Sequence, residues 1–438
     1  MIRKIDGRAK STAWIQNSLN RPSQLEAAAE RAAVLSIIKE VREQGDAALL
    51  RYTREFDRAE LSPEEMPVSE EEIQEAYNKT HPRLLAVLQR AADRIWRFHA
   101  KQKQETWLNF EEQDIVLGQK VTPMERVGVY VPGGKAAYPS SVLMNVIPAR
   151  VAGVEEIIMV SPPGKDRDIH PSILAAAKVA GVSQIYRAGG AQAIAALAYG
   201  TQTIPKVDKI VGPGNIYVAL AKKEVFGHVD IDMIAGPSEI VVIADQSARP
   251  AYVAADLLSQ AEHDSMASSI LITDSLEIFT EVLQELETQT AKLPLKDTIR
   301  SSLRDFGACI LADSIEEAIK LSNALAPEHL ELAIKNPMEQ LGKIRHAGAV
   351  FLGHYSPEPV GDYMAGPNHV LPTSGTARFF SPLSVEDFVK KTSILFYGRE
   401  ALRHIYRDVA DFARMEGLTA HANAMEVRFD KDDEGIST

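Results

Sequence analysis

Short β-rich runs alternate with helix-like stretches through the middle of this 438-residue chain. The run VGVYV at 127–131 ends at Pro-Gly-Gly, and a helix-like stretch follows at 140–151. The same order recurs as far as AVFLG, at 349–353. This alternation predicts an α/β fold with helices on both faces of parallel sheets. Because it restarts at SEIVVIAD, 238–245, we expect two consecutive α/β units.

The two ends of the chain have a different pattern. Residues 24–56 and 70–102 carry apolar side chains at helical spacing between charges, which predicts helices. Residues 384–392 and 400–424 are also helix-like, and a polar end that should fray follows at 430–438. This last segment is too small to hold a core alone, so we expect it to pack on something else, such as a second subunit.

Composition excludes several classes of protein. Hydrophobic residues make up 45% of the chain and charged residues 25%, which is typical of a globular protein. The net charge of −12 argues against nucleic acid as a partner. There is neither a leader-like N-terminus nor an apolar run of the roughly 20 residues that a membrane span needs, so we expect a cytoplasmic protein without membrane contact.

The single cysteine, Cys309, cannot form an intramolecular disulfide, which fits a reducing compartment. One thiol also cannot supply a cysteine-rich zinc site, so any metal must be held by His, Asp, Glu or amide oxygens. The apolar context GACILAD predicts that Cys309 is a buried strand residue rather than a nucleophile.

Three glycine turns follow predicted strands in the first α/β unit: YVPGG at 130–134, AGGAQ at 188–192 and VGPGN at 211–215. Glycines let a ligand approach the backbone, and the helix N-terminus that follows favours an anion. Each turn by itself is more typical of an ordinary tight turn. Three of them together favour a ligand at the carboxyl ends of the strands.

Two short motifs pair side chains that suit metal or proton chemistry. Gln260 and His263 in SQAEHD share one face of a predicted helix end, where they form either half a metal site or a solvated surface. Glu328 and His329 in APEHLEL are either an acid/base pair or two ordinary loop residues.

The long segment 359–379 is rich in glycine and proline, and a loop of this length in a compact fold is usually functional or disordered. Its apolar residues argue against disorder, and Asp362 and His369 are its candidate ligands. Glu416 and His421 in EGLTAHANA could equally belong to a solvated helix face.

These motifs, in this order and spacing, resemble the histidinol dehydrogenase family, as do YVPGG, GGAQAIAALA, GPGN and AGPSE. The resemblance extends from about residue 20 to 425 and implies a homodimer of interlocked subunits. It implies two incomplete Rossmann-like parallel-sheet domains in each subunit, plus small helical N- and C-terminal segments. The domains that we expect are an N-terminal arm at 1–25, a first α/β domain at 26–129 and 239–382, a second at 130–238, and a C-terminal helical segment at 383–438.

The resemblance also implies the cofactors, one Zn²⁺ per subunit and NAD. The implied zinc ligands are Gln260, His263, Asp362 and His421, with His421 donated by the other subunit. The implied NAD contacts are Tyr130, Gln192 and Asn215. The implied substrate contacts are Ser238, Gln260, His263, His329, Asp362, Glu416 and His421, and His369 is a further candidate.

The implied reaction oxidises L-histidinol to L-histidine through L-histidinal with two NAD, the final steps of histidine biosynthesis. In it His329 takes the alcohol proton, and Glu328 activates water for the second oxidation. The alternatives are a paralogue acting on another small alcohol, a zinc hydrolase, and a non-catalytic zinc- or nucleotide-binding protein. A site of this kind does not by itself distinguish zinc from manganese.

Overall fold

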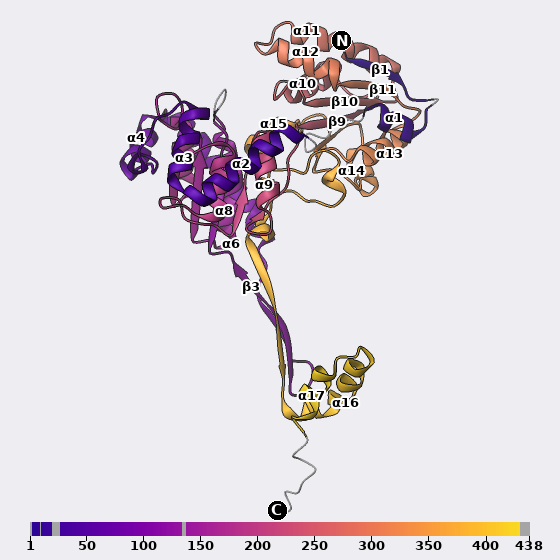
Figure 1. Cartoon of the computed structure of the whole chain (residues 1–438). Helices are drawn as coiled ribbons and strands as arrows, with labels where there is room; N and C mark the ends of the chain where they lie inside the picture. The colour runs from indigo at the N-terminus through magenta and orange to yellow at the C-terminus, as the bar shows by residue number, and fades with distance from the viewer. Residues whose placement is uncertain (1, 9, 20–26, 134–136, 430–438) are drawn as a thin grey trace, which may run out of the picture. The chain divides into compact units, whose positions relative to one another are not determined.

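The structure, a computed structural model, describes residues 2–8, 10–19, 27–133 and 137–429 (Figure 1). The chain divides into two units. Unit 1 comprises Met1–Lys103 and Met124–Phe388, and unit 2 comprises Gln104–Pro123 and Val389–Thr438. The polar end predicted at 430–438 lies outside the described residues, as does the last part of the predicted N-terminal arm, at 20–25.

A five-stranded parallel sheet in unit 1 has the strand order β6-β5-β4-β7-β8. In the register of β4, Val127 lies opposite Ile157 of β5 and Lys209 of β7. The chain runs outward from β4 to β6 and then returns to β7, so the order reverses between β4 and β7. Such a reversal is where open parallel sheets bind ligands. The strands are β4 (Arg126–Tyr130), β5 (Glu156–Ser161), β6 (Gln184–Arg187), β7 (Lys209–Val211) and β8 (Asp230–Ile231).

Helices from two parts of the chain surround this sheet. The connecting helices are α6 (Pro139–Ala152), α7 (Pro171–Ala180), α8 (Gly190–Tyr199) and α9 (Ile216–Val225). Against them pack α2 (Ala28–Gln44), α3 (Asp46–Tyr52), α4 (Glu70–Lys79) and α5 (Pro82–His99). We expected 26–129 to belong with 239–382, and here the structure differs. The apolar faces of α2 and α3, with Val34, Ile38 and Leu49, join the core of the five-stranded sheet.

A six-stranded parallel sheet, β1-β11-β10-β9-β12-β13, forms the rest of unit 1. Its order from β11 to β13 repeats the winding of the five-stranded sheet, and the order again reverses, here between β9 and β12. The first strand of the chain adds the extra edge, because Arg3 pairs with Ala308. The strands are β1 (Arg3–Asp6), β9 (Glu239–Ala244), β10 (Ser268–Thr273), β11 (Ala308–Leu311), β12 (His329–Ala333) and β13 (Ala349–Leu352).

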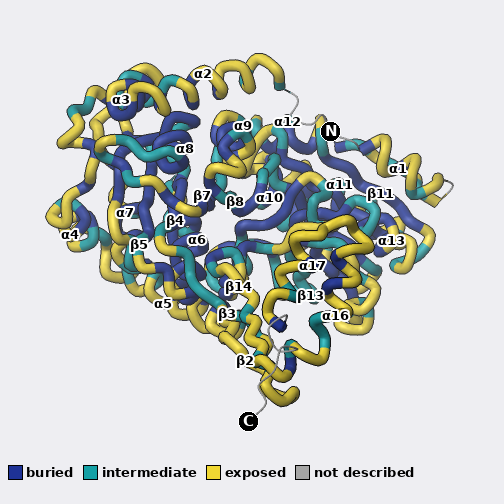
Figure 2. The backbone as a smooth tube through the Cα atoms, turned by 60° about the horizontal axis from the view of Figure 1, so that its bottom comes forward, coloured by how far each residue is buried: buried dark blue, intermediate teal, exposed yellow. Residues whose placement is uncertain are grey.

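Both faces of the six-stranded sheet are covered, so its inner strands β9, β10, β11 and β12 are buried (Figure 2). One face packs on α10 (Pro250–Ala261), α11 (Leu276–Thr290) and α12 (Lys296–Asp305), and the other on α1 (Thr12–Ser18) and α13 (Ile315–Leu325). Cys309 is fully buried in β11, as predicted, and burial raises the pKa of its thiol to about 12.

Unit 2 contains an antiparallel sheet, β14-β3-β2, and two helices. We predicted a helix at 384–392, and this was wrong: a short 3₁₀ helix at Val385–Phe388 leads into β14. Strand β14 pairs with β3 along its whole length, with Val389 opposite Pro123 and Tyr397 opposite Ile115. The elements are β2 (Trp107–Asn109), β3 (Ile115–Pro123), β14 (Val389–Tyr397), α16 (Arg399–Met415) and α17 (Thr419–Glu426).

The remaining elements are short. They are the π-helices η2 (Thr53–Asp57) and η6 (Gly361–Ala365), the helices α14 (Pro337–Gln340) and α15 (Glu358–Val360), and the 3₁₀ turns η3 (Pro63–Glu65), η4 (Ala100–Gln102), η5 (Leu341–Lys343) and η7 (Thr376–Arg378). Within the described ranges, no helix combines the length and the apolar character needed to cross a membrane.

Candidate active site

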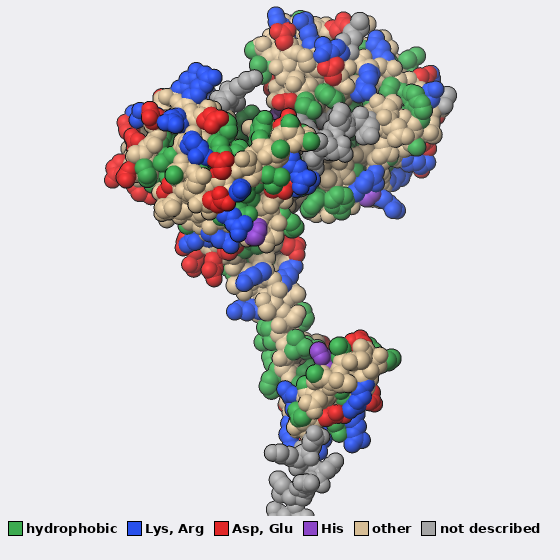
Figure 3. All heavy atoms as spheres, viewed as in Figure 1, with side chains coloured by type: hydrophobic (Ala, Val, Ile, Leu, Met, Phe, Trp, Pro, Cys, Tyr) green, Lys and Arg blue, Asp and Glu red, His purple; other side chains and the backbone are tan. Residues whose placement is uncertain are grey.

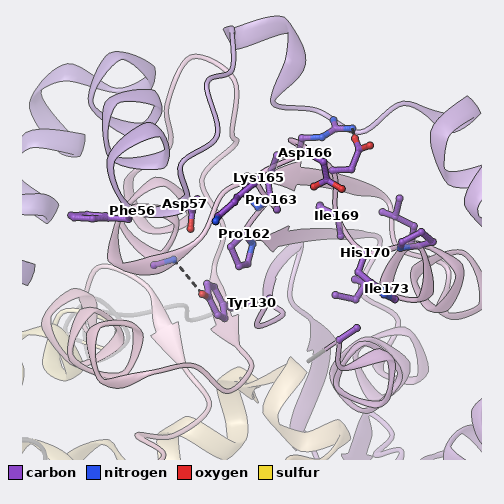
Figure 4. Close-up of a pocket in the computed structure, with 18 of the residues that line it drawn as sticks. Phe56, Asp57, Tyr130, Pro162, Pro163, Lys165, Asp166, Ile169, His170 and Ile173 are labelled. Atoms are coloured by element: carbon purple, nitrogen blue, oxygen red, sulfur yellow. Dashed lines mark hydrogen bonds and ion pairs between the residues drawn. The ribbon is translucent and has the colours of Figure 1, made fainter. Parts of the chain in front are cut away.

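A cavity of about 1160 Å³ lies at the carboxyl-terminal edge of the five-stranded sheet (Figure 4). Tyr130 ends β4, Gln192 lies in the first turn of α8, and Asn215 precedes α9, and all three line this cavity. Because these residues follow neighbouring parallel strands, the sheet itself brings the three predicted glycine turns to one place. Gly134 of the first turn is not among the described residues.

The glycines of these turns fix the shape of the cavity floor. Gly212 has φ +113°, and a Cβ there would clash with the carbonyl oxygen of Tyr130. The Tyr130 hydroxyl accepts a hydrogen bond of 3.2 Å from the Gly190 N–H. Asn215 caps α9 by accepting from the Tyr217 and Val218 N–H groups at 3.0 and 3.2 Å. Burial raises the pKa of Tyr130 to about 12, so its hydroxyl keeps its proton.

A second group of polar side chains lies at the amino-terminal edge of the six-stranded sheet. His329 is the first residue of β12 and pairs in register with Ile240 of β9. Its Nδ1 lies 3.0 Å from the carbonyl oxygen of Glu239, and Glu328 Oε2 accepts from the Glu239 N–H at 2.9 Å. Both side chains of the predicted acid/base pair are therefore buried and held by the backbone at the start of β9.

This hydrogen bond defines the tautomer of His329. A carbonyl oxygen can only accept, so Nδ1 carries the hydrogen and Nε2 presents a lone pair. Nε2 is buried and has no hydrogen-bond partner among the described residues. Burial lowers the pKa of His329 to about 4, which keeps the ring neutral, and raises the pKa of Glu328 well above its usual value. The pair offers a free imidazole base beside a carboxyl group.

Donors suited to a metal ion surround Nε2 of His329. It lies 3.9 Å from Glu358 Oε1 and 4.0 Å from Asp362 Oδ1. One ligand atom each from His263, Glu358 and Asp362 lie within 4.8 Å of one another. Gln260 is completely buried, and neither atom of its amide has a hydrogen-bond partner in the described structure. A buried amide without partners is costly unless a ligand satisfies it, so this nitrogen- and oxygen-donor set fits a zinc ion.

Comparison with known proteins identifies the relatives of this chain. A sequence model of the family described as "Histidinol dehydrogenase" matches residues 19–429. The histidinol dehydrogenase of Geobacter sulfurreducens is 60% identical over 397 residues, which cover 90% of this chain and 92% of the relative. The one from Caldanaerobacter subterraneus is 57% identical over 432 residues, covering 99% and 100%. The crystal structure of histidinol dehydrogenase from Elizabethkingia anophelis, 40% identical, superposes with a TM-score of 0.93 and covers 99% of both chains.

The chain belongs to the histidinol dehydrogenase family. Its fold is the α/β architecture with two Rossmann-like parallel sheets that the sequence predicted. The family resemblance on which the sequence analysis relied is thereby confirmed.

Two further predicted residues of this histidinol dehydrogenase homologue lie near His329. Ser238 is half-buried directly before β9, where its carbonyl accepts from the Ser268 N–H at 3.0 Å. The Nδ1 of His369 lies 4.0 Å from Asp362 Oδ1, and its Nε2 is buried without a partner in the described residues. Burial raises the pKa of Asp362 to about 7 and lowers that of His369 to about 4.

Sequence reasoning missed Glu358. This residue starts α15, is almost completely buried, and accepts a 3.4 Å hydrogen bond from the Ser259 hydroxyl. It precedes Pro359, so it stands one residue outside the loop that was singled out. Its spacing of four residues from Asp362 is the available signal, because helical residues four apart share a face.

Glu416 and His421 belong to unit 2. Glu416 ends α16, His421 lies in the first turn of α17, and both are exposed. That His421 completes the zinc site from the other subunit, and that Glu416 contacts the substrate, both stay predictions.

Proposed function

We propose that this protein oxidises L-histidinol to L-histidine through L-histidinal, as the final steps of histidine biosynthesis. The observation that carries the proposal is the buried, neutral His329, whose free Nε2 faces the donors Glu358, Asp362 and His263. Membership of the family supports histidinol as the substrate. It argues against a hydrolase or a paralogue with another substrate.

Gln260, His263 and Asp362 would hold one Zn²⁺, with His421 contributed by the partner subunit. When bound, the metal would fix the imidazole and amino nitrogens of the substrate as a template. The two unsatisfied amide atoms of Gln260 support this ligand set. Glu358 lies close enough to His263 and Asp362 to be a further ligand or to hold the ligands in place.

Tyr130, Gln192 and Asn215 would bind NAD, which supplies the hydride acceptor in each oxidation. The cavity that these residues line is large enough for a dinucleotide, and the buried Nε2 of Gln192 has no hydrogen-bond partner among the described residues. The N-termini of α8 and α9 open onto the same cavity and favour a diphosphate.

In the first oxidation, His329 Nε2 takes the proton of the alcohol, and the Glu239 carbonyl stabilises the resulting imidazolium through Nδ1–H. In the second, Glu328 accepts a proton from the water that adds to the aldehyde. Its raised pKa makes its carboxylate a stronger base than an exposed glutamate. Enclosure of these groups keeps the aldehyde from bulk water between the two steps.

Subunit assembly belongs to the proposal as well. Unit 2 exposes large apolar side chains, visible in Figure 3, and Leu395 and Met415 leave 71% and 77% of their surfaces accessible. Such surfaces fit burial against a second subunit in an interlocked homodimer. The single cysteine is consistent with a reducing cytoplasmic compartment.

The decisive experiment measures NADH formed per L-histidinol consumed at saturating NAD, with and without a chelator. We expect two NADH per substrate, lost on chelation and restored by zinc. One NADH would mean that oxidation stops at the aldehyde, and none would refute the proposed reaction.

The variant Glu328→Gln should slow the oxidation of added L-histidinal more than that of L-histidinol. Equal losses in the two steps would contradict the separate role of Glu328.

A further inference from the structure

Asp57 is a carboxylate in the wall of the large cavity to which neither the family resemblance nor the proposed mechanism gives a role. It ends the π-helix η2, and the next residue, Arg58, has φ +59° and stops the helix. Asp57 lines the cavity together with Phe56 and Tyr130 (Figure 4). Asp57 is half-buried and borders the cavity, so its side chain lies at the boundary that a ligand would contact.

The carboxylate of Asp57 is enclosed but lacks a partner. Its Oδ2 is inaccessible to solvent and accepts no hydrogen bond from any described residue. Its Oδ1 lies 3.2 Å from the position that a Cβ on Gly189 would take, so it sits against the turn that begins α8. Burial raises the pKa of Asp57 to about 7, because no described cation compensates its charge. Hydrogen-bond donors from a ligand would relieve this cost.

The charges around the cavity limit what that ligand group can be. Five acidic residues line it, namely Asp57, Glu72, Glu75, Asp166 and Asp168, against the cations Lys79, Lys165 and Arg187 and one histidine, His170. Arg187 is already engaged by Glu72 and Asp168. A phosphate beside Asp57 would meet uncompensated like charge, whereas hydroxyl groups would donate to it.

We propose that Asp57 accepts hydrogen bonds from the 2′- and 3′-hydroxyls of the adenosine ribose of NAD and thereby selects against a 2′-phosphorylated cofactor. The inference rests on the proposed function, since it takes the cavity to be the NAD site. A carboxylate that binds a vicinal diol with two charge-assisted hydrogen bonds repels a phosphate in the same place.

The positions of the lining residues indicate that the adenosine of NAD would lie at the end of the cavity that contains Asp57. A smaller apolar pocket of about 230 Å³ is lined by both Ser172 and Asp362. The large cavity is lined by His170 and Pro171, directly before Ser172, so this end lies toward the metal donors and suits the nicotinamide. The other end lies between η2 and α2, where Phe56 exposes 51% of its surface and offers a ring face to an adenine base.

The test combines a change in the enzyme with a change in the cofactor. Asp57→Asn keeps the shape but removes the charge, and Glu55→Gln is the matched control, since Glu55 is an exposed carboxylate of the same π-helix that does not line the cavity. KM and kcat are measured with L-histidinol and NAD, NADP or 2′-deoxy-NAD, and calorimetry gives the affinity of the zinc-loaded proteins for each cofactor.

We expect Asp57→Asn to raise KM for NAD by about 10- to 100-fold with little change in kcat, since a hydrogen bond to a charged group contributes this much. The preference for NAD over NADP should fall at least about tenfold, consistent with the loss of one such bond. Removing the 2′-hydroxyl should weaken binding to the unchanged protein but not to the variant. Glu55→Gln should leave the affinities for all three cofactors within about twofold of those of the unchanged protein.

Equal sensitivity of the unchanged protein and Asp57→Asn to loss of the 2′-hydroxyl would overturn the inference. So would an unaltered ratio of NAD to NADP use. These outcomes are distinct from failure of the proposed function, in which the unchanged protein itself would form no NADH from L-histidinol. Equal affinity of the unchanged protein for NAD and 2′-deoxy-NAD would also overturn the inference, and this outcome does not depend on how well the variant folds.

Discussion

The two parallel sheets of unit 1 have the same winding but present their polar residues at opposite edges. In the five-stranded sheet the cavity follows the carboxyl ends of β4, β6 and β7. In the six-stranded sheet, Glu239 and His329 stand at the first residues of β9 and β12. Both groups lie beside the strand pair at which the order reverses, β4/β7 in one sheet and β9/β12 in the other.

The difference follows from the helix ends that each edge presents. Helices α8 and α9 begin at the cavity, and free N–H groups at a helix start favour an anion such as a diphosphate. Helix α10 ends beside the second site, with Gln260 in its last turn and His263 just beyond. The carbonyl end of a helix favours a cation. One fold, used twice, thus supplies the two edges that we propose as an anion-binding edge in the five-stranded sheet and a cation-binding edge in the six-stranded sheet.

Among variants that would affect one edge and not the other, we expect the largest loss of activity from His329→Asn. The asparagine amide can still donate to the Glu239 carbonyl, but the base at Nε2 is lost. We expect kcat to fall by about 10²- to 10⁴-fold, the usual contribution of a general base. Calorimetry should find NAD affinity unchanged, because the cavity lies at the other sheet. A fall of less than tenfold would remove His329 from the role of base.

Lys222→Met tests how the anion-binding edge is held together. Lys222 and Asp232 form a buried ion pair, and the two side chains also bind the carbonyl and the N–H of Gly212 at 3.0 and 2.8 Å. Leaving Asp232 buried and unpaired should cost about 3–5 kcal/mol of unfolding free energy.

Urea denaturation measures this cost, and the exposed neighbour Lys223→Met is the matched control, expected within about 0.5 kcal/mol. The folded Lys222→Met and Lys223→Met proteins should contain the same amount of zinc, because neither residue lies at the proposed metal site. Equal stability of the two variants would mean that the ion pair does not hold the Gly212 turn.

A smaller effect on stability and on KM for NAD should distinguish the N-cap residues of two helices, one packed on each sheet. Asn215 caps α9 at the cavity, and Ser275 caps α11 of the six-stranded sheet through the Ile278 N–H at 3.3 Å. Alanine at either position should cost about 1 kcal/mol of stability. Only Asn215→Ala should also raise KM for NAD, which steady-state kinetics would measure. A similar rise in KM for Ser275→Ala would show that the effect is general loosening.

The smallest effect is expected in the interior of the six-stranded sheet. Since burial raises the pKa of Cys309 to about 12, its thiol should stay protonated and unreactive in the folded protein at neutral pH. A chromogenic disulfide reagent should detect no thiol before denaturation and one per chain afterwards. Rapid labelling of the native protein would mean that this sheet opens much more readily than its packing implies.

Local patterns predicted much of unit 1 correctly. The strand–turn–helix alternation identified the α/β class. Local capping chemistry is also present, since Ser314 caps α13 by accepting from the Glu317 N–H at 3.3 Å. The pattern failed in unit 2, where 389–392 belongs to a strand. Strand β14 pairs with β3, and a partner so distant in sequence leaves no signal in a helical-periodicity count.

Sequence by itself determined which chemical groups this protein has available. These are the glycine turns before helices, the adjacent Glu328 and His329, and histidine, carboxylate and amide side chains as metal ligands, since there is only one cysteine. Tertiary structure decided which of them meet. Parallel pairing of β9 with β12 buries His329 against the Glu239 backbone, and the chain after β13 brings Glu358 within 3.9 Å of its ring. The physical reason is that burial and proximity depend on contacts between distant segments, whereas turn geometry and helix caps depend on neighbours along the chain.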